Sequence, residues 1–250
     1  MKLRVVKAKS VLNPSKVFDY CLNPYTGCAF GCRYCYARLF IPRYSGHREP
    51  WGDFVDVKVN APELLRKQLK KAKKGTIWVS SVCDPYQPIE AKTRLTRRLL
   101  TEVARNPFPL NIQTKSDLVL RDLDLFLELE DITVGTTITT EDEAMARHFE
   151  PNAPPVKRRL RALRKIHEAG LRTFVFIGPL LPGSPEKLVD RLEGCADHVF
   201  IDRMNYAGTL RGLYRALGCE EALEEAFFQE MKQRFVQALS ARAISFEVLF

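Results

Sequence analysis

The sequence lacks any uninterrupted apolar run close to the ~18–20 residues that a transmembrane helix needs. It also lacks low-complexity segments and internal repeats of fixed period. Its first twenty residues include basic side chains but no continuous apolar segment and no small-residue cleavage site. We therefore expect no secretion signal, no membrane association and a cytoplasmic protein.

The composition is that of an ordinary globular protein, with 46% hydrophobic and 28% charged residues in a chain of 250. This length suits one large domain with its own core, and no boundary is visible. The formal net charge is +9, which favours polyanionic partners without establishing one. Disordered, collagen-like and coiled-coil classes are excluded by the same values.

Short β-branched runs alternate with helix-like stretches about six times, which predicts an α/β fold with a parallel sheet. Six units are too few for a closed eight-stranded barrel, so we expect a partial (open) parallel β/α barrel. A helix and a strand would extend it at the C-terminal end. Ligands of such folds bind where the strands end. The predicted strands lie within 18–22, 76–82, 110–114, 132–138, 172–178 and 197–201, with an extra one within 244–250.

The helix-like stretches are identified by apolar stripes and by their terminal residues. The first is expected to end at Gly75, and the one after residue 183 to begin with Ser184 as its cap and Pro185 at the first position. The predicted helices cover 61–75, 93–106, 117–130, 156–170, 184–194 and 219–239. The first sixty residues are expected to be dominated by loops.

Four of the seven cysteines lie between positions 21 and 35. Cys28, Cys32 and Cys35 have the spacing Cys-x3-Cys-x2-Cys, and Gly27 and Gly31 permit tight turns around them. A cysteine cluster in a chain without a secretion signal indicates metal binding or catalysis rather than disulfides. Three thiolates on a four-iron cluster would leave one iron free for another ligand.

Three other interpretations of the cysteine loop remain open at this point. Cys21 could complete a structural zinc site, or a four-cysteine cluster that only transfers electrons. The thiols could also be unliganded. Cys21 lies inside an apolar run, where it serves equally well as a small buried hydrophobe.

The cysteine motif, with the aromatic Tyr34 before its last cysteine, resembles the signature of the radical S-adenosylmethionine (radical SAM) superfamily. Stretches such as NPYTGCAFGCRYCYAR, VCDPYQPIE, TKSDLVLRDLDL and VGTTITT resemble the spore photoproduct lyase-related, DNA-repair-photolyase-like branch. The resemblance covers residues 10–210. We therefore expect a single domain over 1–250, with that core and a C-terminal extension over 211–250.

This resemblance implies a 4Fe–4S cluster on Cys28, Cys32 and Cys35, with S-adenosyl-L-methionine as co-substrate. An electron from an external one-electron reductant would cleave S-adenosylmethionine, and the 5′-deoxyadenosyl radical would abstract hydrogen from a substrate. Lys115 suits a carboxylate because a lysine is a mobile point charge, although it could be a surface residue. The residues expected at the cofactor are Tyr34 near the adenine, Lys115 at the methionyl carboxylate, and Asp84, Thr136 and Thr137.

Cys83 follows the second strand of the series and is the candidate catalytic thiol, since spore photoproduct lyase returns hydrogen to its product from a thiol near this strand. The branch often has threonine here, and a small buried cysteine at a strand end is the alternative. Glu90 is expected to cap the next helix rather than to join the site. Cys195 and Cys219 receive no function.

The substrate class stays open, with nucleic acid as one candidate. Three groups of basic residues lie within 67–74, 94–98 and 157–165. We expect them on the solvent-exposed faces of outer helices. At the cysteine loop, arginines interleave with aromatic residues, an arrangement that suits nucleotides or a hydrophobic lid. These residues are Arg33, Arg38, Arg43, Arg48, Tyr36, Phe40, Tyr44 and Trp51. The alternative to a radical enzyme is a non-enzymatic metal protein, with structural zinc or an electron-transfer cluster.

Overall fold

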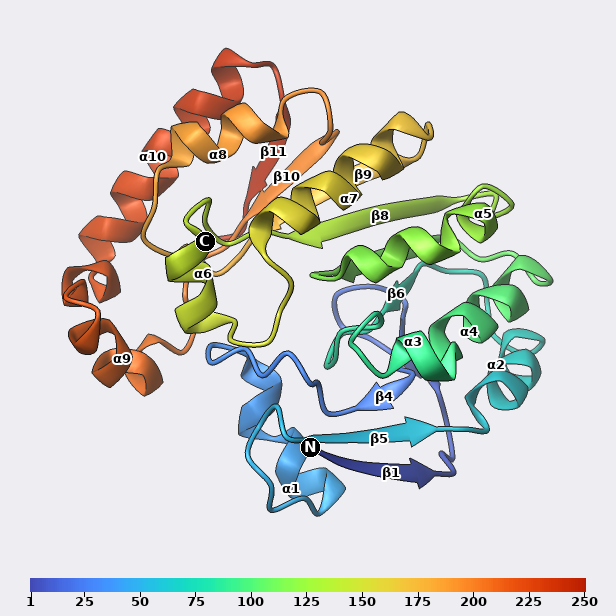
Figure 1. The fold of residues 1–250 in the computed structure, drawn as a ribbon. Coiled ribbons are helices and arrows are strands. Elements are labelled where there is room, and N and C mark those ends of the chain that lie inside the picture. Colours follow the sequence, from blue (N-terminus) through green and yellow to red (C-terminus); the bar gives the residue numbers. More distant parts are fainter.

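The computed structural model describes residues 1–250 and contains a curved sheet of eight strands (Figure 1). The strand order is β11-β10-β9-β8-β7-β6-β3-β2, and every neighbouring pair from β3 to β11 is parallel. The strands are β2 (Leu12–Pro14), β3 (Tyr20–Leu22), β6 (Ile77–Val79), β7 (Leu110–Thr114), β8 (Ile132–Thr137), β9 (Arg172–Ile177), β10 (His198–Ile201) and β11 (Ser245–Val248). The partial parallel barrel is thus confirmed, and β11 extends it beside β10.

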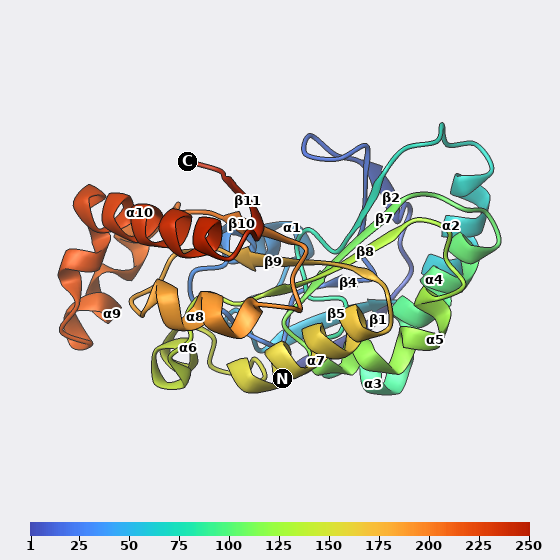
Figure 2. The ribbon, with the colours of Figure 1, turned by 90° about the horizontal axis from the view of Figure 1, so that it is seen from above.

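Helices connect the parallel strands and lie along one side of the sheet, as Figure 2 shows for α3, α7 and α8. Residues of β7 alternate between buried and half-buried, because Leu110, Ile112 and Thr114 face one way and Asn111 and Gln113 the other. The helices are α2 (Ala61–Leu69), α3 (Glu90–Thr93), α4 (Leu95–Ala104), α5 (Leu123–Phe126), α6 (Glu143–Phe149), α7 (Val156–Glu168), α8 (Pro185–Leu192), α9 (Arg211–Ala216) and α10 (Glu225–Ala241). No helix is both long and apolar enough to span a bilayer.

Several predicted helices have different bounds in the structure. The first ends at Leu69 instead of Gly75, because the next five residues include four lysines whose charges repel one another. The stretch 93–106 breaks at Arg94, which adopts a left-handed φ of 48°. Ser184 caps α8 as predicted, accepting a hydrogen bond from the Lys187 amide. The stretches 117–130 and 219–239 begin as 3-10 turns, η2 (Asp117–Asp122) and η4 (Glu220–Leu223).

Loops make up more than half of the first sixty residues, as expected, but the strands among them were only partly predicted. A second sheet, in the order β1-β5-β4, forms from β1 (Lys2–Val6), β5 (Phe54–Lys58) and β4 (Tyr25–Thr26). β1 is parallel to β5 and β4 is antiparallel to it, and Figure 1 shows this sheet beside α1 (Ile41–Ser45). Since β4 ends one residue before Gly27, this sheet fixes the point where the cysteine loop begins.

Candidate functional site

The three motif cysteines lie on the loop between β4 and the 3-10 turn η1 (Tyr36–Leu39). Cys28 and Cys32 are each 7% exposed and pack around Phe30, and Cys35 is half-buried against the same group. All seven cysteines are free thiols. The loop therefore gathers three unpaired thiols in a largely buried setting, while Cys21 stays on β3 outside this packed group.

Two amide side chains hold the backbone of the loop. Gln87, which is fully buried, accepts from the Ala29 N–H at 2.8 Å and donates to the Gly27 carbonyl at 3.2 Å. Asn152 donates to the Ala29 carbonyl at 3.0 Å from the other side. These contacts satisfy the loop's backbone groups without secondary structure, so the loop has one defined shape.

Both glycines of the motif are required by the structure. Gly27 has a φ of 87°, and a Cβ there would lie 2.4 Å from the Phe54 carbonyl oxygen. Gly31 has a φ of 61° and lies against the backbone of Gly52. Positive φ together with the 2.4 Å approach excludes a side chain at Gly27, and positive φ with a 3.2 Å contact disfavours one at Gly31.

The thiols are neutral in the absence of metal. Burial raises the pKa of Cys32 to about 12 and raises the pKa values of Cys28 and Cys35 as well. A bound metal removes such protons, because only the thiolate coordinates. No three His, Cys, Asp or Glu side chains are gathered closely enough to hold a single metal ion. The cysteine set suits a cluster in which each thiolate binds a different iron.

A second buried group, of alternating charge, lies beside Cys32. Tyr34 donates its hydroxyl hydrogen bond to Glu150 Oε1, and Lys115 Nζ is 3.9 Å from the same oxygen and 5.5 Å from the centre of the Tyr34 ring. Arg159 Nη2 lies 2.5 Å from Glu150 Oε2. Sequence reasoning found Tyr34 and Lys115 but missed Glu150 and Arg159.

Arg159 corrects the expectation that the basic group at 157–165 is entirely solvated, since it is only 2% exposed. Its Nε donates to the Pro154 carbonyl at 2.8 Å and its Nη1 to the Thr137 carbonyl at 3.2 Å. The signal was present in the sequence. Arg159 lies three residues after Val156 and seven before Ile166, which places it on the inward stripe of α7.

The charged side chains of Glu150, Lys115 and Arg159 shift one another's pKa values. Burial alone would raise the pKa of Glu150, but Arg159 and Lys115 outweigh it and lower that pKa. Burial alone would lower the pKa of Lys115, but its acidic neighbours raise it overall, Glu150 as a carboxylate and Cys32 once it is a thiolate. The group therefore presents a carboxylate and two cations near neutral pH.

Asp84 joins the ends of two strands. Its carboxylate accepts from the Thr114 hydroxyl at 2.6 Å, from the Lys115 amide at 2.8 Å and from the Tyr86 amide at 2.9 Å. Burial raises the pKa of Asp84 in spite of these bonds. Asp84 thus holds the backbone of Lys115 in place.

The two threonines at the end of β8 point in different directions. Thr136 donates its hydroxyl hydrogen bond to the Thr114 carbonyl at 3.0 Å. Thr137 accepts from the Gln113 side chain at 2.7 Å, on the other side of the sheet. In this structure both hydroxyls are bonded within the sheet, as β-sheet residues commonly are.

Cys83 lies half-buried against the group of Cys28, Phe30 and Cys32. Its sulfur is 3.4 Å from the Ser80 hydroxyl oxygen and 3.6 Å from the Tyr25 carbonyl oxygen. Glu90, by contrast, accepts from the Thr96 amide at 2.9 Å, at the start of α4, as its expected capping role requires.

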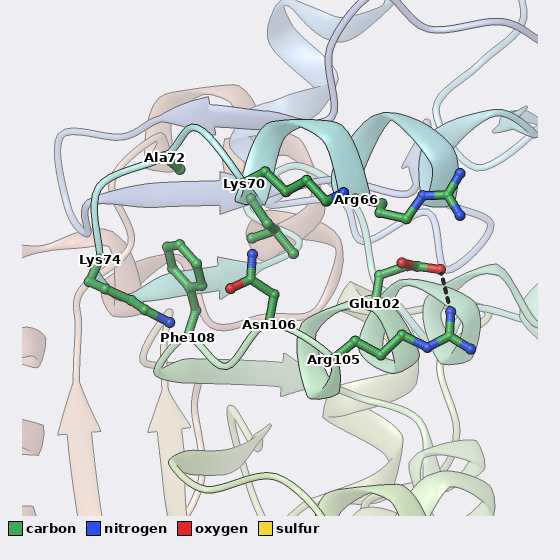
Figure 3. Close-up of a pocket in the computed structure, with 9 residues that line it drawn as sticks. Arg66, Lys70, Ala72, Lys74, Glu102, Arg105, Asn106 and Phe108 are labelled. Atoms are coloured by element: carbon green, nitrogen blue, oxygen red, sulfur yellow. Dashed lines mark hydrogen bonds and ion pairs between the residues drawn. The ribbon is translucent and has the colours of Figure 1, made fainter.

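A cavity of about 520 Å³ lies elsewhere, and Figure 3 shows the side chains around it. It sits at the C-terminal ends of α2 and α4 and beside the residues that precede β6 and β7. That is the opposite end of the strands from the cysteine loop. It is lined by Arg66, Leu69, Lys70, Ala72, Lys74, Glu102, Arg105, Asn106 and Phe108, and is therefore not the candidate site.

A parallel β/α sheet with a glycine-shaped loop of three free thiols beside a largely buried cation is the arrangement of a protein that can hold an iron–sulfur cluster. Residues 22–193 match the family model of the radical SAM superfamily. The chain belongs to this superfamily, and membership implies a 4Fe–4S cluster and S-adenosylmethionine. The donor set fits the cluster, because Cys28, Cys32 and Cys35 are free, adjacent and held by a fixed loop.

Similar proteins include an uncharacterised protein of Methanocaldococcus jannaschii, 41% identical over 179 residues, which make up 71% of this chain and 67% of that protein. A protein of Acidianus two-tailed virus is 35% identical over 171 residues, 65% of this chain and 56% of that protein. A Mycobacterium tuberculosis protein is 33% identical over 190 residues, 71% of this chain and 55% of that protein. The matched segments thus span only part of these relatives.

Solved structures share the fold across nearly the whole chain. Spore photoproduct lyase complexed with dinucleoside spore photoproduct has a TM-score of 0.69 at 16% identity, covering 99% of this chain and 82% of that chain. A mutant of the same enzyme carries bound S-adenosylmethionine. Streptococcus suis SuiB bound to precursor peptide SuiA has a TM-score of 0.64 at 14% identity, and the match covers 92% of this chain and 48% of that chain.

Proposed function

We propose that the protein is a radical S-adenosylmethionine enzyme whose cofactor carboxylate binds at Lys115. The observation that carries the proposal is the state of the Lys115 ammonium. Its side chain is only 14% exposed, lies beside Cys32, and has one ionic contact, to Glu150, at 3.9 Å. A buried cation with its hydrogen-bond donors unused is suited to receive a carboxylate.

The chain's own residues prepare this place for the cofactor. Asp84 fixes the Lys115 backbone, and Glu150 keeps the ammonium charged and close to Tyr34. Tyr34 remains protonated, because burial and the Glu150 charge raise its pKa well above the usual range. When bound, the 4Fe–4S cluster supplies the electron that cleaves S-adenosylmethionine to methionine and a 5′-deoxyadenosyl radical.

Within this function, Cys83 is our candidate for returning a hydrogen atom to the product radical. Burial raises the pKa of Cys83 to about 11, so the sulfur keeps its hydrogen near neutral pH. After the transfer, one electron from the external reductant and one proton restore the thiol. Packing against the cysteine loop supports this role.

We propose nucleic acid as the substrate class, on the chemistry of the surface beside the loop. Tyr36, Phe40 and Tyr44 form an aromatic row with ring centres 5.8 and 6.3 Å apart, and Tyr44 is 85% exposed. Arg33 and Arg43 are exposed within the same segment. Stacking rings among cations suit bases and phosphates.

Anaerobic reconstitution tests the proposed function directly. We expect iron and acid-labile sulfide to be incorporated, and the reduced protein to release 5′-deoxyadenosine and methionine slowly from S-adenosylmethionine, even without substrate. Chromatography of the mixture provides the measurement. A tightly held zinc without sulfide, or a verified 4Fe–4S cluster that releases no deoxyadenosine under strong reductant, would support the non-enzymatic metal protein instead.

Replacing Lys115 with alanine should weaken S-adenosylmethionine binding by about ten- to a hundredfold, the equivalent of one charge-assisted hydrogen bond. Iron content should be unchanged, because Lys115 is not a cluster ligand. Equilibrium binding to the reconstituted protein gives the affinity, with Lys157→Ala on the exposed face of α7 as the matched control. Equal affinities for Lys115→Ala and the control would remove Lys115 from the site.

A further inference from the structure

Trp51 carries a polar group that the fold leaves unsatisfied. Its indole Nε1 is buried and has no hydrogen-bond partner. The ring packs against the group of Cys28, Phe30 and Cys32 and lies edge-on to Phe54, with ring centres 5.9 Å apart. The unsatisfied N–H therefore belongs to a side chain in contact with the thiol loop.

Several carbonyl oxygens of the loop already accept hydrogen bonds. The Gly27 carbonyl accepts from Gln87, and the Ala29 carbonyl accepts from Asn152. The Cys28 carbonyl accepts from the Gly31 amide. Folded proteins leave few buried N–H groups unpaired, because each costs the desolvation of the group. The thiol sulfurs of Cys28 and Cys32 belong to the group against which Trp51 packs, and they are weak acceptors while they are neutral.

The backbone of Trp51 and Gly52 lies directly against the cysteine loop. The Trp51 carbonyl oxygen and the Gly52 Cα are 3.5 and 3.2 Å from the place where a Gly31 Cβ would be. Gly52 has a φ of 106°, which turns the chain sharply after Trp51. The cysteine motif and the tryptophan are thus held in direct backbone contact, and a Cβ at either glycine would lie 3.0 to 3.2 Å from the other glycine's Cα.

We infer that the Trp51 indole N–H donates a hydrogen bond to a sulfur of the bound cluster, either a cysteine thiolate or an inorganic sulfide. The inference rests on the cluster of the proposed function. Cluster sulfurs carry negative charge, and it increases when the cluster is reduced. A donor at this position stabilises the reduced form and raises the reduction potential, since hydrogen bonds to the sulfurs tune clusters in this way. Trp51 is a positioning and tuning residue, not a ligand.

The test is Trp51→Phe, which keeps an aromatic ring and removes the N–H. Iron and sulfide content should match the unsubstituted protein, while the equilibrium constant for cluster reduction should fall about tenfold, as expected for loss of a hydrogen bond to a charged acceptor. Redox titration without S-adenosylmethionine gives this value. Trp78→Phe is the control, because Trp78 is the second of two tryptophans and stacks on Phe18.

A second measurement needs no variant. In protein labelled with ¹⁵N-tryptophan, cluster assembly should shift or broaden the indole signal of Trp51 more than that of Trp78. An unchanged reduction equilibrium in Trp51→Phe, or two equally unaffected indole signals, overturns the inference. Both readouts are independent of radical chemistry, so a protein that assembles its cluster but releases no deoxyadenosine contradicts the proposed function alone. A protein that assembles no cluster contradicts both.

Discussion

Alanine at Cys28, Cys32 or Cys35 should each abolish cluster binding. The three thiols are the free, adjacent cysteines of one fixed loop, and each is expected to hold a separate iron. Losing one thiolate leaves an iron without a protein ligand, and the loop offers no replacement donor. Iron and sulfide per chain, together with the visible absorbance after anaerobic reconstitution, measure the loss.

Cys21→Ala is the matched control for this series. Cys21 lies on β3, where it pairs with Asn13 and Trp78 across the sheet, away from the packed group of the loop. The substitution should leave the visible absorbance nearly intact and cost about 1 kcal/mol of stability, as point mutations commonly do. Complete loss of the cluster in Cys21→Ala would instead identify a four-cysteine centre, with no open iron for S-adenosylmethionine.

Arg159→Met should lower the free energy of unfolding by about 3–5 kcal/mol. The side chain is 2% exposed and pairs with a fully buried carboxylate, so its removal leaves Glu150 charged without its closest cation. The carbonyls of Pro154 and Thr137 also lose their donors. Denaturant unfolding of the metal-free protein measures the change. Following the unfolding by circular dichroism and by tryptophan fluorescence tests whether it is two-state.

Two comparisons make the Arg159 result specific. Arg158→Met removes a neighbouring arginine whose partner, Asp117, is on the surface, and should cost about 1 kcal/mol or less. The double variant Arg159→Met, Glu150→Gln should recover part of the loss, because no carboxylate is then buried without its arginine, while Lys115 loses its one ionic contact. A loss as small as that of Arg158→Met would show that the buried pair contributes no more than a surface one.

The parallel strands were predictable because each is a compact apolar run, and β7 matches its predicted bounds. The second sheet was missed because charged residues interrupt both of its longer strands, Lys2–Val6 and Phe54–Lys58, and its third strand has two residues. These short segments gain their stability from pairing with one another rather than from local propensity.

The site shows the same division between local and distant information. The cysteine motif is complete within eight residues, so its spacing alone identifies it. Glu150 meets Tyr34 across 116 residues of sequence, and only the folded sheet brings them together. Arg159 was hidden among exposed basic neighbours, although its place in the helical period indicated burial.

The segment after β6 connects the two parts of the site, the cysteine loop and Lys115. Gln87 hydrogen-bonds to the backbone of the cysteine loop, and Asp84, three residues earlier, accepts a hydrogen bond from the Lys115 amide. The same short segment, from Asp84 to Gln87, therefore bonds both the cysteine loop and the backbone of Lys115. Two coupled binding sites affect each other equally. If the bound cluster increases the affinity of Lys115 for a carboxylate, then a carboxylate bound at Lys115 increases the affinity for the cluster by the same factor. Cluster loss in air should accordingly be slower when S-adenosylmethionine is present.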